Sequence, residues 1–211
     1  MRVNHIEPEQ PKIDIFRARI PWEPGARLGE DCNRIIAESR HPYVCIMDDD
    51  FLMLHELWYL VAQHAINRLP NTGIFTCWTN TSLAQNRCNV PPNIPKRLQD
   101  PNKASIGEHR EFAIKIWRQY GYELRDIPHT TTGMFMIIKR AAWAETGGFP
   151  GGGLFGQDDG FCEKLLKTGY QITLICGLYG YHLRNRQPID WGIEHPTSAT
   201  IWKERKQACN Q

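Results

Sequence analysis

Three consecutive carboxylates, Asp48, Asp49 and Asp50, directly follow the apolar run at residues 43–47, Tyr-Val-Cys-Ile-Met. An apolar run without polar interruption predicts a strand buried on both faces, as in a parallel sheet covered by helices. In open α/β sheets ligands bind at the carboxyl ends of the strands, so the carboxylates lie where a ligand is expected. Adjacent carboxylates repel one another, and Mg²⁺ or Mn²⁺, which prefer carboxylate oxygen, would offset that repulsion.

A solvated acidic turn is the simpler interpretation of three aspartates. The residues that follow, 51–60, are largely apolar, which indicates that the chain returns to the core rather than entering solvent. A charged site on a rigid scaffold is therefore favoured. Two more polar clusters, Gln157-Asp158-Asp159 and Tyr181-His182-Leu183-Arg184, stand at the expected start of a helix and end of a strand.

Composition places the chain among globular proteins. It has 211 residues, 41% hydrophobic and 23% charged, with a formal net charge of +2, and we expect one domain. No apolar run is long enough to span a bilayer, and the first residues contain no apolar core of a signal peptide, so we expect a cytoplasmic protein. The seven cysteines are dispersed without a Cys-x-x-Cys pair, which argues against a zinc site and fits a reducing compartment.

Hydrophobic periodicity predicts alternating strands and helices. We expect an α/β fold in which a mostly parallel central sheet is flanked by helices. Residues 79–101 are rich in Asn, Gln, Pro and Arg and predict a long substrate-facing loop. The expected strands are 13–20, 43–47, 72–78, 132–138, 171–176 and 178–182, and the expected helices are 28–39, 52–68, 105–120, 140–146 and 160–168.

The ordered series of motifs resembles the GT-A (Rossmann-like) glycosyltransferases, and among them the large inverting family 2. The resemblance covers roughly residues 13–185 and implies a compact catalytic domain, with 13–78 as the nucleotide and metal half and 79–185 as the acceptor half. Residues 1–12 would then be a lead-in, and 186–211 a tail on or near the site. The matching segments are Cys45-Ile46-Met47-Asp48-Asp49-Asp50, Thr132 to Arg140, Gly147-Gly148-Phe149, Gly156 to Leu165, Gly169-Tyr170 and Tyr181-His182.

The resemblance implies roles for the aspartates. In the family's Asp-x-Asp motif the first carboxylate lies by the nucleotide ribose and the last binds the metal, which corresponds to Asp48 and Asp50. Asp49 takes the middle place, and the triple aspartate leaves the register open by one, so Asp48 is also a candidate metal ligand. His182 matches a position that ligates metal in many relatives. Without the resemblance, a histidine at a strand end is more often a surface residue or a hydrogen-bonded core residue than a metal ligand.

The resemblance also implies a catalytic base. Inverting transfer requires a base on the acceptor hydroxyl, and the family uses the Asp of a Glu-Asp pair at a helix N-terminus. The pair here is Gln157-Asp158, so Asp158 is the candidate base and Asp159 the alternative. Gln in place of Glu removes a neighbouring charge, which bears on acceptor contacts and on the tuning of the base. Both aspartates are equally suited to stabilise a helix N-terminus, and the two roles are compatible.

The front of the chain is short for this family, because only 47 residues precede the aspartates. Residues 13–25 would have to bind the nucleotide. Arg19, Trp22 and Arg27 are candidate diphosphate or base contacts from their location, with surface charge and core packing as the alternatives. The pattern leaves the choice between a UDP-sugar and a GDP-sugar open.

These observations predict a metal-dependent inverting glycosyltransferase that uses Mn²⁺ or Mg²⁺ and a nucleotide-sugar donor. A glycan or lipopolysaccharide hydroxyl is the first expectation for the acceptor. One alternative is a phage-type enzyme that glycosylates a DNA base, and another is a non-catalytic module that binds nucleotide sugars; a nucleotidyltransferase fits the motif order less well. Phosphate contacts to DNA would involve Asn86, Arg87, Lys96, Arg97, Lys103 and Arg110.

Overall fold

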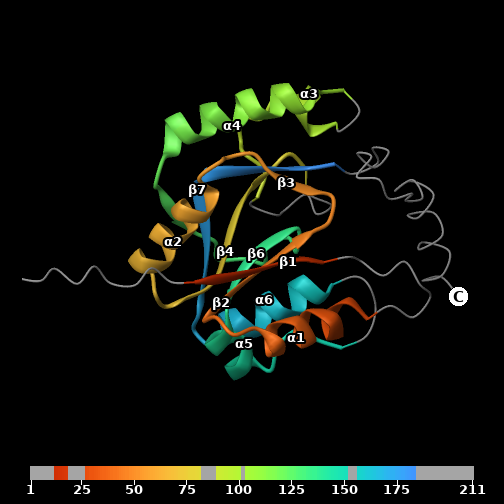
Figure 1. Ribbon diagram of the computed structural model, residues 1–211, viewed down its shortest axis with the longest axis vertical. Coiled ribbons are helices and arrows are strands. Elements are labelled where there is room, and N and C mark those ends of the chain that lie inside the picture. Colours follow the sequence, from red (N-terminus) through yellow and green to blue (C-terminus); the bar gives the residue numbers. More distant parts are fainter. Residues whose placement is uncertain (1–11, 19–26, 82–88, 101–102, 152–155, 184–211) are drawn as a thin grey trace, which may run out of the picture.

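The computed structural model describes residues 12–18, 27–81, 89–100, 103–151 and 156–183. Within these residues the chain forms a mixed α/β structure around one sheet (Figure 1). The strands are β1 (Ile13–Ala18), β2 (Tyr43–Asp48), β3 (Phe51–Met53), β4 (Thr72–Thr79), β5 (Leu124–Asp126), β6 (Phe135–Lys139) and β7 (Gln171–His182). The helices are α1 (Leu28–Glu38), α2 (Trp58–Arg68), α3 (Lys96–Gln99), α4 (Ile106–Tyr120), α5 (Arg140–Thr146) and α6 (Gln157–Lys167).

The strand order in the sheet is β1-β2-β6-β4-β7-β3, and β5 also pairs with β7. The pairs β1·β2 and β4·β7 are parallel, and β6 is antiparallel to both of its neighbours. The four longest of the described strands, β1, β2, β4 and β7, therefore run in one direction. The predicted α/β class with a mostly parallel sheet is confirmed in this sense, with β6 as an antiparallel strand inside it.

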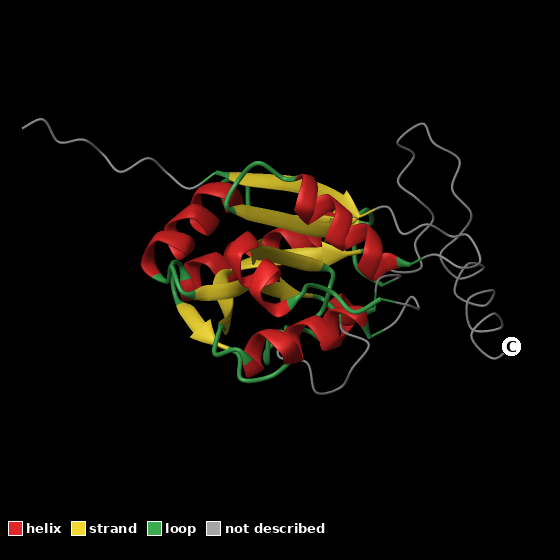
Figure 2. Cartoon of the chain, turned by 90° about the horizontal axis from the view of Figure 1, so that it is seen from below, coloured by secondary structure: helices red, strands yellow, loops and turns green. Residues whose placement is uncertain are grey.

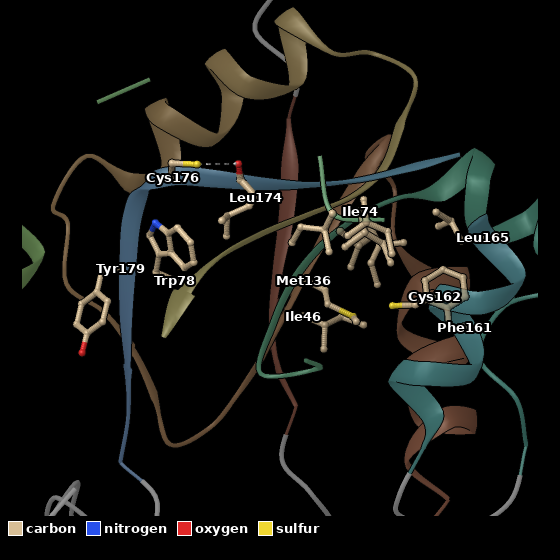
Figure 3. Packing of buried hydrophobic residues seen from close by; sticks show 14 of the residues in the cluster. Ile46, Ile74, Trp78, Met136, Phe161, Cys162, Leu165, Leu174, Cys176 and Tyr179 are labelled. Carbon is tan, nitrogen blue, oxygen red and sulfur yellow. Dashed lines mark hydrogen bonds between the residues drawn. The ribbon is translucent and has the colours of Figure 1, made fainter. Parts of the chain in front are cut away.

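Helices cover both faces of the sheet (Figure 2). The alternation along β2 sends Val44 and Ile46 into a core cluster that includes residues of α1, α4, α5 and α6. It sends Cys45 and Met47 to the opposite face, where buried residues of α2 pack. Figure 3 shows the first of these clusters, in which α6 lies beside β2, β4 and β6 through its labelled side chains Phe161, Cys162 and Leu165. These contacts fix α6 relative to the sheet.

The periodicity predicts one helix over residues 52–68, but the structure has a strand followed by a helix there. The segment begins with β3, which pairs antiparallel with the end of β7, and α2 starts only at Trp58. Phe51 is fully buried and stacks on Phe135 of β6, so its apolar character reflects a sheet environment. A strand of three residues carries too little periodicity to be distinguished from the first turn of a helix.

The last two predicted strands are one continuous strand, β7. In the sequence, Gly177 suggests a break between two strands. In the structure it lies at an irregularity of the β4·β7 pairing, where Cys77 and Trp78 of β4 pair with Ile175 and Tyr179. A Cβ atom at position 177 would collide with the main chain of Gly121, so only glycine allows β7 to pass this close to the end of α4. β5, a short and mainly exposed strand paired with β7, has no apolar pattern and is missed by the sequence analysis.

Most other elements agree with their predicted ranges to within a few residues. α4 begins with a capping box in which Ser105 accepts from the Glu108 N–H while the Glu108 side chain accepts from the Ser105 N–H. α6 begins at Gln157 rather than near residue 160, and β6 begins at Phe135 rather than near residue 132. The five described cysteines, Cys32, Cys45, Cys77, Cys162 and Cys176, are buried, and no disulfide joins any two of them.

Asp14 joins β1 to the turn before β2. Its Oδ2 accepts hydrogen bonds from the Ser39 hydroxyl and from the N–H groups of Arg40 (3.1 Å) and His41 (3.2 Å). Burial alone would raise the pKa of Asp14, but the hydrogen bonds from Ser39, His41 and Arg40 and the nearby His41 charge outweigh it, and the net pKa is lowered. The carboxylate thus stabilises the folded chain.

We expect Asp14→Ala to lower the free energy of unfolding by about 2 kcal/mol near pH 7, as for a lost hydrogen-bonded charge. Because the folded pKa lies below the unfolded value, the stabilisation is present above about pH 4 and is lost as the pH falls through the folded pKa. Urea unfolding at pH 7 and pH 3 measures both effects. Asp31→Ala, which removes an exposed pair with Arg34 and a negative charge in the first turn of α1, should cost about 1 kcal/mol or less; an equal loss in the two variants would contradict this account.

Candidate metal and catalytic site

The turn between β2 and β3 brings the aspartates to the end of β7. Asp48 is the last residue of β2, and the chain reverses over Asp49 and Asp50 into β3. β3 then pairs with β7 so that Phe51 is the partner of His182, and the Leu183 N–H donates to the Asp50 carbonyl oxygen (3.0 Å). The short strand that the sequence analysis misses is therefore the element that places Asp50 beside His182.

Three side chains converge at this point. His182 Nε2 lies 2.9 Å from Asp50 Oδ1 and 3.6 Å from Asp48 Oδ2. One ligand atom from each of the three residues lies within 4.8 Å of the others. Exposure of the side chains rises from 8% for His182 through 18% for Asp48 to 38% for Asp50, so the cluster is buried on one side and open on the other.

The electrostatic environment of Asp48 is unfavourable to its charge. Burial raises its pKa most, the charge of His182 lowers it, and the carboxylates of Asp50, Asp49 and Asp158 raise it further, to a net value of about 6. A carboxylate at a strand end is thus surrounded by like charges. A cation at this position would offset the repulsion.

The donor set fits a divalent metal ion. Two carboxylates and one imidazole supply hard oxygen ligands and one nitrogen, and their spacing lets one ion reach all three. Mn²⁺ accepts this mixture more readily than Mg²⁺, which favours all-oxygen shells with several waters. Asp48, Asp50 and His182 are the residues that would hold the ion.

Asp158 lies at the start of α6 and faces the same loop as Asp48. Its Oδ2 accepts from the Gly133 N–H (2.8 Å), and the Asp48 N–H donates to the carbonyl oxygen of Met134, the next residue (3.0 Å). A Cβ atom at position 133 would lie 3.3 Å from the Asp158 Cβ, so the missing side chain permits this close approach. Two consecutive residues before β6 thus hold the Asp158 carboxylate and the Asp48 main chain.

Gln157 is buried, with 6% exposure, and its side chain points toward the first turn of α1. A Cβ atom at Gly29 would lie 2.5 Å from Gln157 Oε1, which shows how closely the amide packs against that helix. A glutamate at the same place would bring a charge into this contact, and burial of a charge is costly unless it is paired. Packing therefore gives a physical reason for an amide here.

The other predicted site residues are not among the three clustered side chains, and two of them are outside the described residues. Arg27 precedes α1 and forms an exposed ion pair with Glu30 (2.8 Å), while Arg19 and Trp22 are outside the described residues. Asp49 lies in the turn between Asp48 and Asp50, and Asp159 follows Asp158 in the first turn of α6. The nucleotide-binding roles of Asp48, Asp49, Arg19, Trp22 and Arg27 remain predictions, as does the division into domain halves.

Two of the basic side chains proposed for DNA contact form ion pairs with carboxylates. Arg97 forms an ion pair with Glu108, and Lys103 forms one with Asp100 (3.0 Å). Asn86 and Arg87 are outside the described residues. Lys96 and Arg110 are exposed.

No family model and no curated protein matches the chain. Among solved structures, a mannosyltransferase from Pyrobaculum calidifontis in complex with GDP-Man and Mn²⁺ is similar at 18% identity and a TM-score of 0.45, covering 76% of this chain and 37% of that one. TarS from S. aureus, in complex with UDP-GlcNAc, is similar at 10% identity and a TM-score of 0.47, covering 85% of this chain and 46% of that one. This chain thus spans less than half the length of either.

Across the residues described, no helix combines the length and apolar character that a bilayer crossing requires.

Proposed function

We propose that this chain is a metal-dependent glycosyltransferase that moves a sugar from a nucleotide-sugar donor to an acceptor hydroxyl with inversion. The observation that carries the proposal is the convergence of Asp48 and Asp50 with His182, which lies more than a hundred residues later in the chain, beside a further carboxylate on α6. Metal ligands and a separate carboxylate are the two requirements of this reaction.

In the proposed reaction Asp158 takes the proton of the acceptor hydroxyl. The hydroxyl oxygen forms a bond to the anomeric carbon on the face opposite the leaving group, and the bond from that carbon to the diphosphate oxygen breaks, its electron pair leaving with the nucleoside diphosphate. A divalent ion on Asp48, Asp50 and His182 would neutralise the charge of the diphosphate. The Gly133 N–H donates to Asp158 Oδ2 and holds the carboxylate in place.

Transfer by the purified chain should require a divalent ion. We expect EDTA to abolish release of nucleoside diphosphate from a panel of UDP- and GDP-sugars offered with hydroxyl acceptors. Mn²⁺ should restore it more fully than Mg²⁺ because of the imidazole nitrogen in the donor set. A coupled assay for the released diphosphate measures this, and equal turnover with and without EDTA would overturn the metal-dependent assignment.

The same panel distinguishes a transferase from a non-catalytic module. Calorimetric binding of a donor without hydrolysis or transfer to any acceptor would favour a module that only binds nucleotide sugars. Double-stranded DNA is included among the acceptors, and transfer of labelled sugar to it would identify the DNA-modifying alternative.

A further inference from the structure

The side chain of Asn80, the residue directly after β4, forms hydrogen bonds with both the N–H and the C=O of His182. The His182 N–H donates to Asn80 Oδ1 (2.8 Å), and Asn80 Nδ2 donates to the His182 carbonyl oxygen (3.1 Å). Asn80 is fully buried. The side chain of one residue thus takes up both main-chain polar groups of a candidate metal ligand.

This pair of hydrogen bonds, called the Asn80 clasp below, continues the sheet beyond the point where β4 ends. The parallel β4·β7 pairing reaches Thr79 and Gly180, after which the β4 main chain leaves β7. On the other side of β7, β3 is held by the bond from the Leu183 N–H to the Asp50 carbonyl oxygen, so the N–H and C=O of His182 point toward Asn80 rather than toward β3. The Asn80 amide has the donor and acceptor of a peptide group, and it supplies one more rung to the ladder at this position.

A second set of buried hydrogen bonds holds Asn80 itself. The Thr79 hydroxyl donates to Asn80 Oδ1 (3.3 Å), and the Thr79 N–H donates to the Asn89 carbonyl oxygen (2.7 Å). The Asn89 amide in turn accepts from the Thr131 hydroxyl (2.8 Å), and Thr131 is two residues before Gly133. Buried polar groups that are fully satisfied in this way hold one unique geometry.

We propose that Asn80 is a positioning residue that sets the place of the His182 imidazole relative to Asp48 and Asp50 and thereby determines metal affinity. The inference rests on the metal site of the proposed function and extends it to a residue outside the three-residue cluster. Partners that orient metal ligands typically contribute a factor of about 10 to 100 in metal affinity. Asn80 acts on the main chain of the ligand rather than on its ring, so it orients the whole residue.

The matched control is Asn33 of α1. It makes the same double clasp on a different residue, since Asn33 Nδ2 donates to the Phe149 carbonyl oxygen (2.9 Å) and the Phe149 N–H donates to Asn33 Oδ1 (2.9 Å). Phe149 belongs to the loop before α6 and carries no metal ligand. Asn33→Ala and Asn80→Ala therefore both remove an amide that binds a main chain twice, and only Asn80→Ala does so at the metal cluster.

Calorimetric titration of the full chain with Mn²⁺ alone tests the proposal. We expect Asn80→Ala to weaken Mn²⁺ binding by about 10-fold to 100-fold and Asn33→Ala to change it less than about 2-fold. If Asn80→Ala does not fold, Asn80→Thr, whose hydroxyl can keep one of the two bonds, should weaken binding to an intermediate extent. Equal Mn²⁺ affinity in wild type and in a folded Asn80 variant would overturn the proposal.

A second measurement on the metal-free protein separates this proposal from the proposed function. The ¹⁵N NMR shifts of the His182 imidazole, recorded at pH 8, report its contact with Asp50. We expect them to move toward those of a free imidazole in Asn80→Ala and to stay unchanged in Asn33→Ala. If the wild type binds no Mn²⁺ but this contrast is present, the metal site is refuted and the positioning role stands; unchanged His182 shifts in Asn80→Ala overturn the positioning role.

Discussion

Asp158→Asn is expected to reduce sugar transfer by about 10³-fold while leaving Mn²⁺ and donor binding intact. A general base contributes about 10² to 10⁴ in rate, and the amide cannot take the proton of the acceptor hydroxyl. The amide oxygen can still accept the Gly133 N–H, so the loop before β6 should keep its position. Single-turnover transfer measures the rate, and calorimetry with Mn²⁺ and donor measures the binding.

Asp159→Asn is the matched control for this change. Both aspartates lie in the first turn of α6, where a negative charge interacts favourably with the helix dipole, so the two variants lose the same stabilising interaction. Asp158 accepts a hydrogen bond from the Gly133 N–H and is among the charges that act on Asp48. Full activity in Asp158→Asn with loss in Asp159→Asn would transfer the role of base to Asp159; full activity in both would refute a base on α6.

The parts of the fold that the sequence predicts are those with a local pattern. β2 is continuous and apolar because both of its faces are covered, and α4 combines helical spacing with a capping box at Ser105. Such signals depend only on neighbours in the chain. They suffice to predict an α/β fold and to place Asp48 at the end of a buried strand.

The parts that the sequence does not predict depend on contacts between distant segments. β3 is a strand because β7 offers an edge next to it, and three residues cannot express that need in their own pattern. Asn80 is an unremarkable polar residue in an amide-rich stretch, and its importance comes from the His182 main chain more than a hundred residues later. The signal that could have found it is an asparagine placed directly after a buried strand, where its amide can extend the ladder.

The candidate site falls between these two cases. The order of the motifs singles out Asp48, Asp50, Asp158 and His182, but their meeting requires the turn into β3 and the loop before β6. Periodicity predicts neither of these connections. The metal and base roles of the four residues are therefore best tested by changes that leave both connections in place.

Asp50→Asn is such a change, and we expect it to weaken Mn²⁺ binding by at least about 100-fold. It removes one of two carboxylate ligands, while the amide keeps the size of the side chain and leaves the Asp50 main-chain bond to Leu183 untouched. Without metal the variant should be as stable as the wild type or more so, because Asp50 is one of the like charges that oppose the ionisation of Asp48.

A merely structural role for Asp50 predicts the opposite pattern, since its contact with His182 (2.9 Å) would then be a stabilising interaction. Thermal unfolding with and without Mn²⁺ distinguishes a metal-ligand role of Asp50 from a merely structural one. A ligand that binds the folded state but not the unfolded state raises the melting temperature. The wild type should therefore gain stability in Mn²⁺, and Asp50→Asn should gain little or none. Asp49→Asn, in the same turn but outside the cluster, should respond to Mn²⁺ like the wild type; a melting temperature that is lower in Asp50→Asn without metal, with an undiminished gain in Mn²⁺, would remove Asp50 from the proposed ligands.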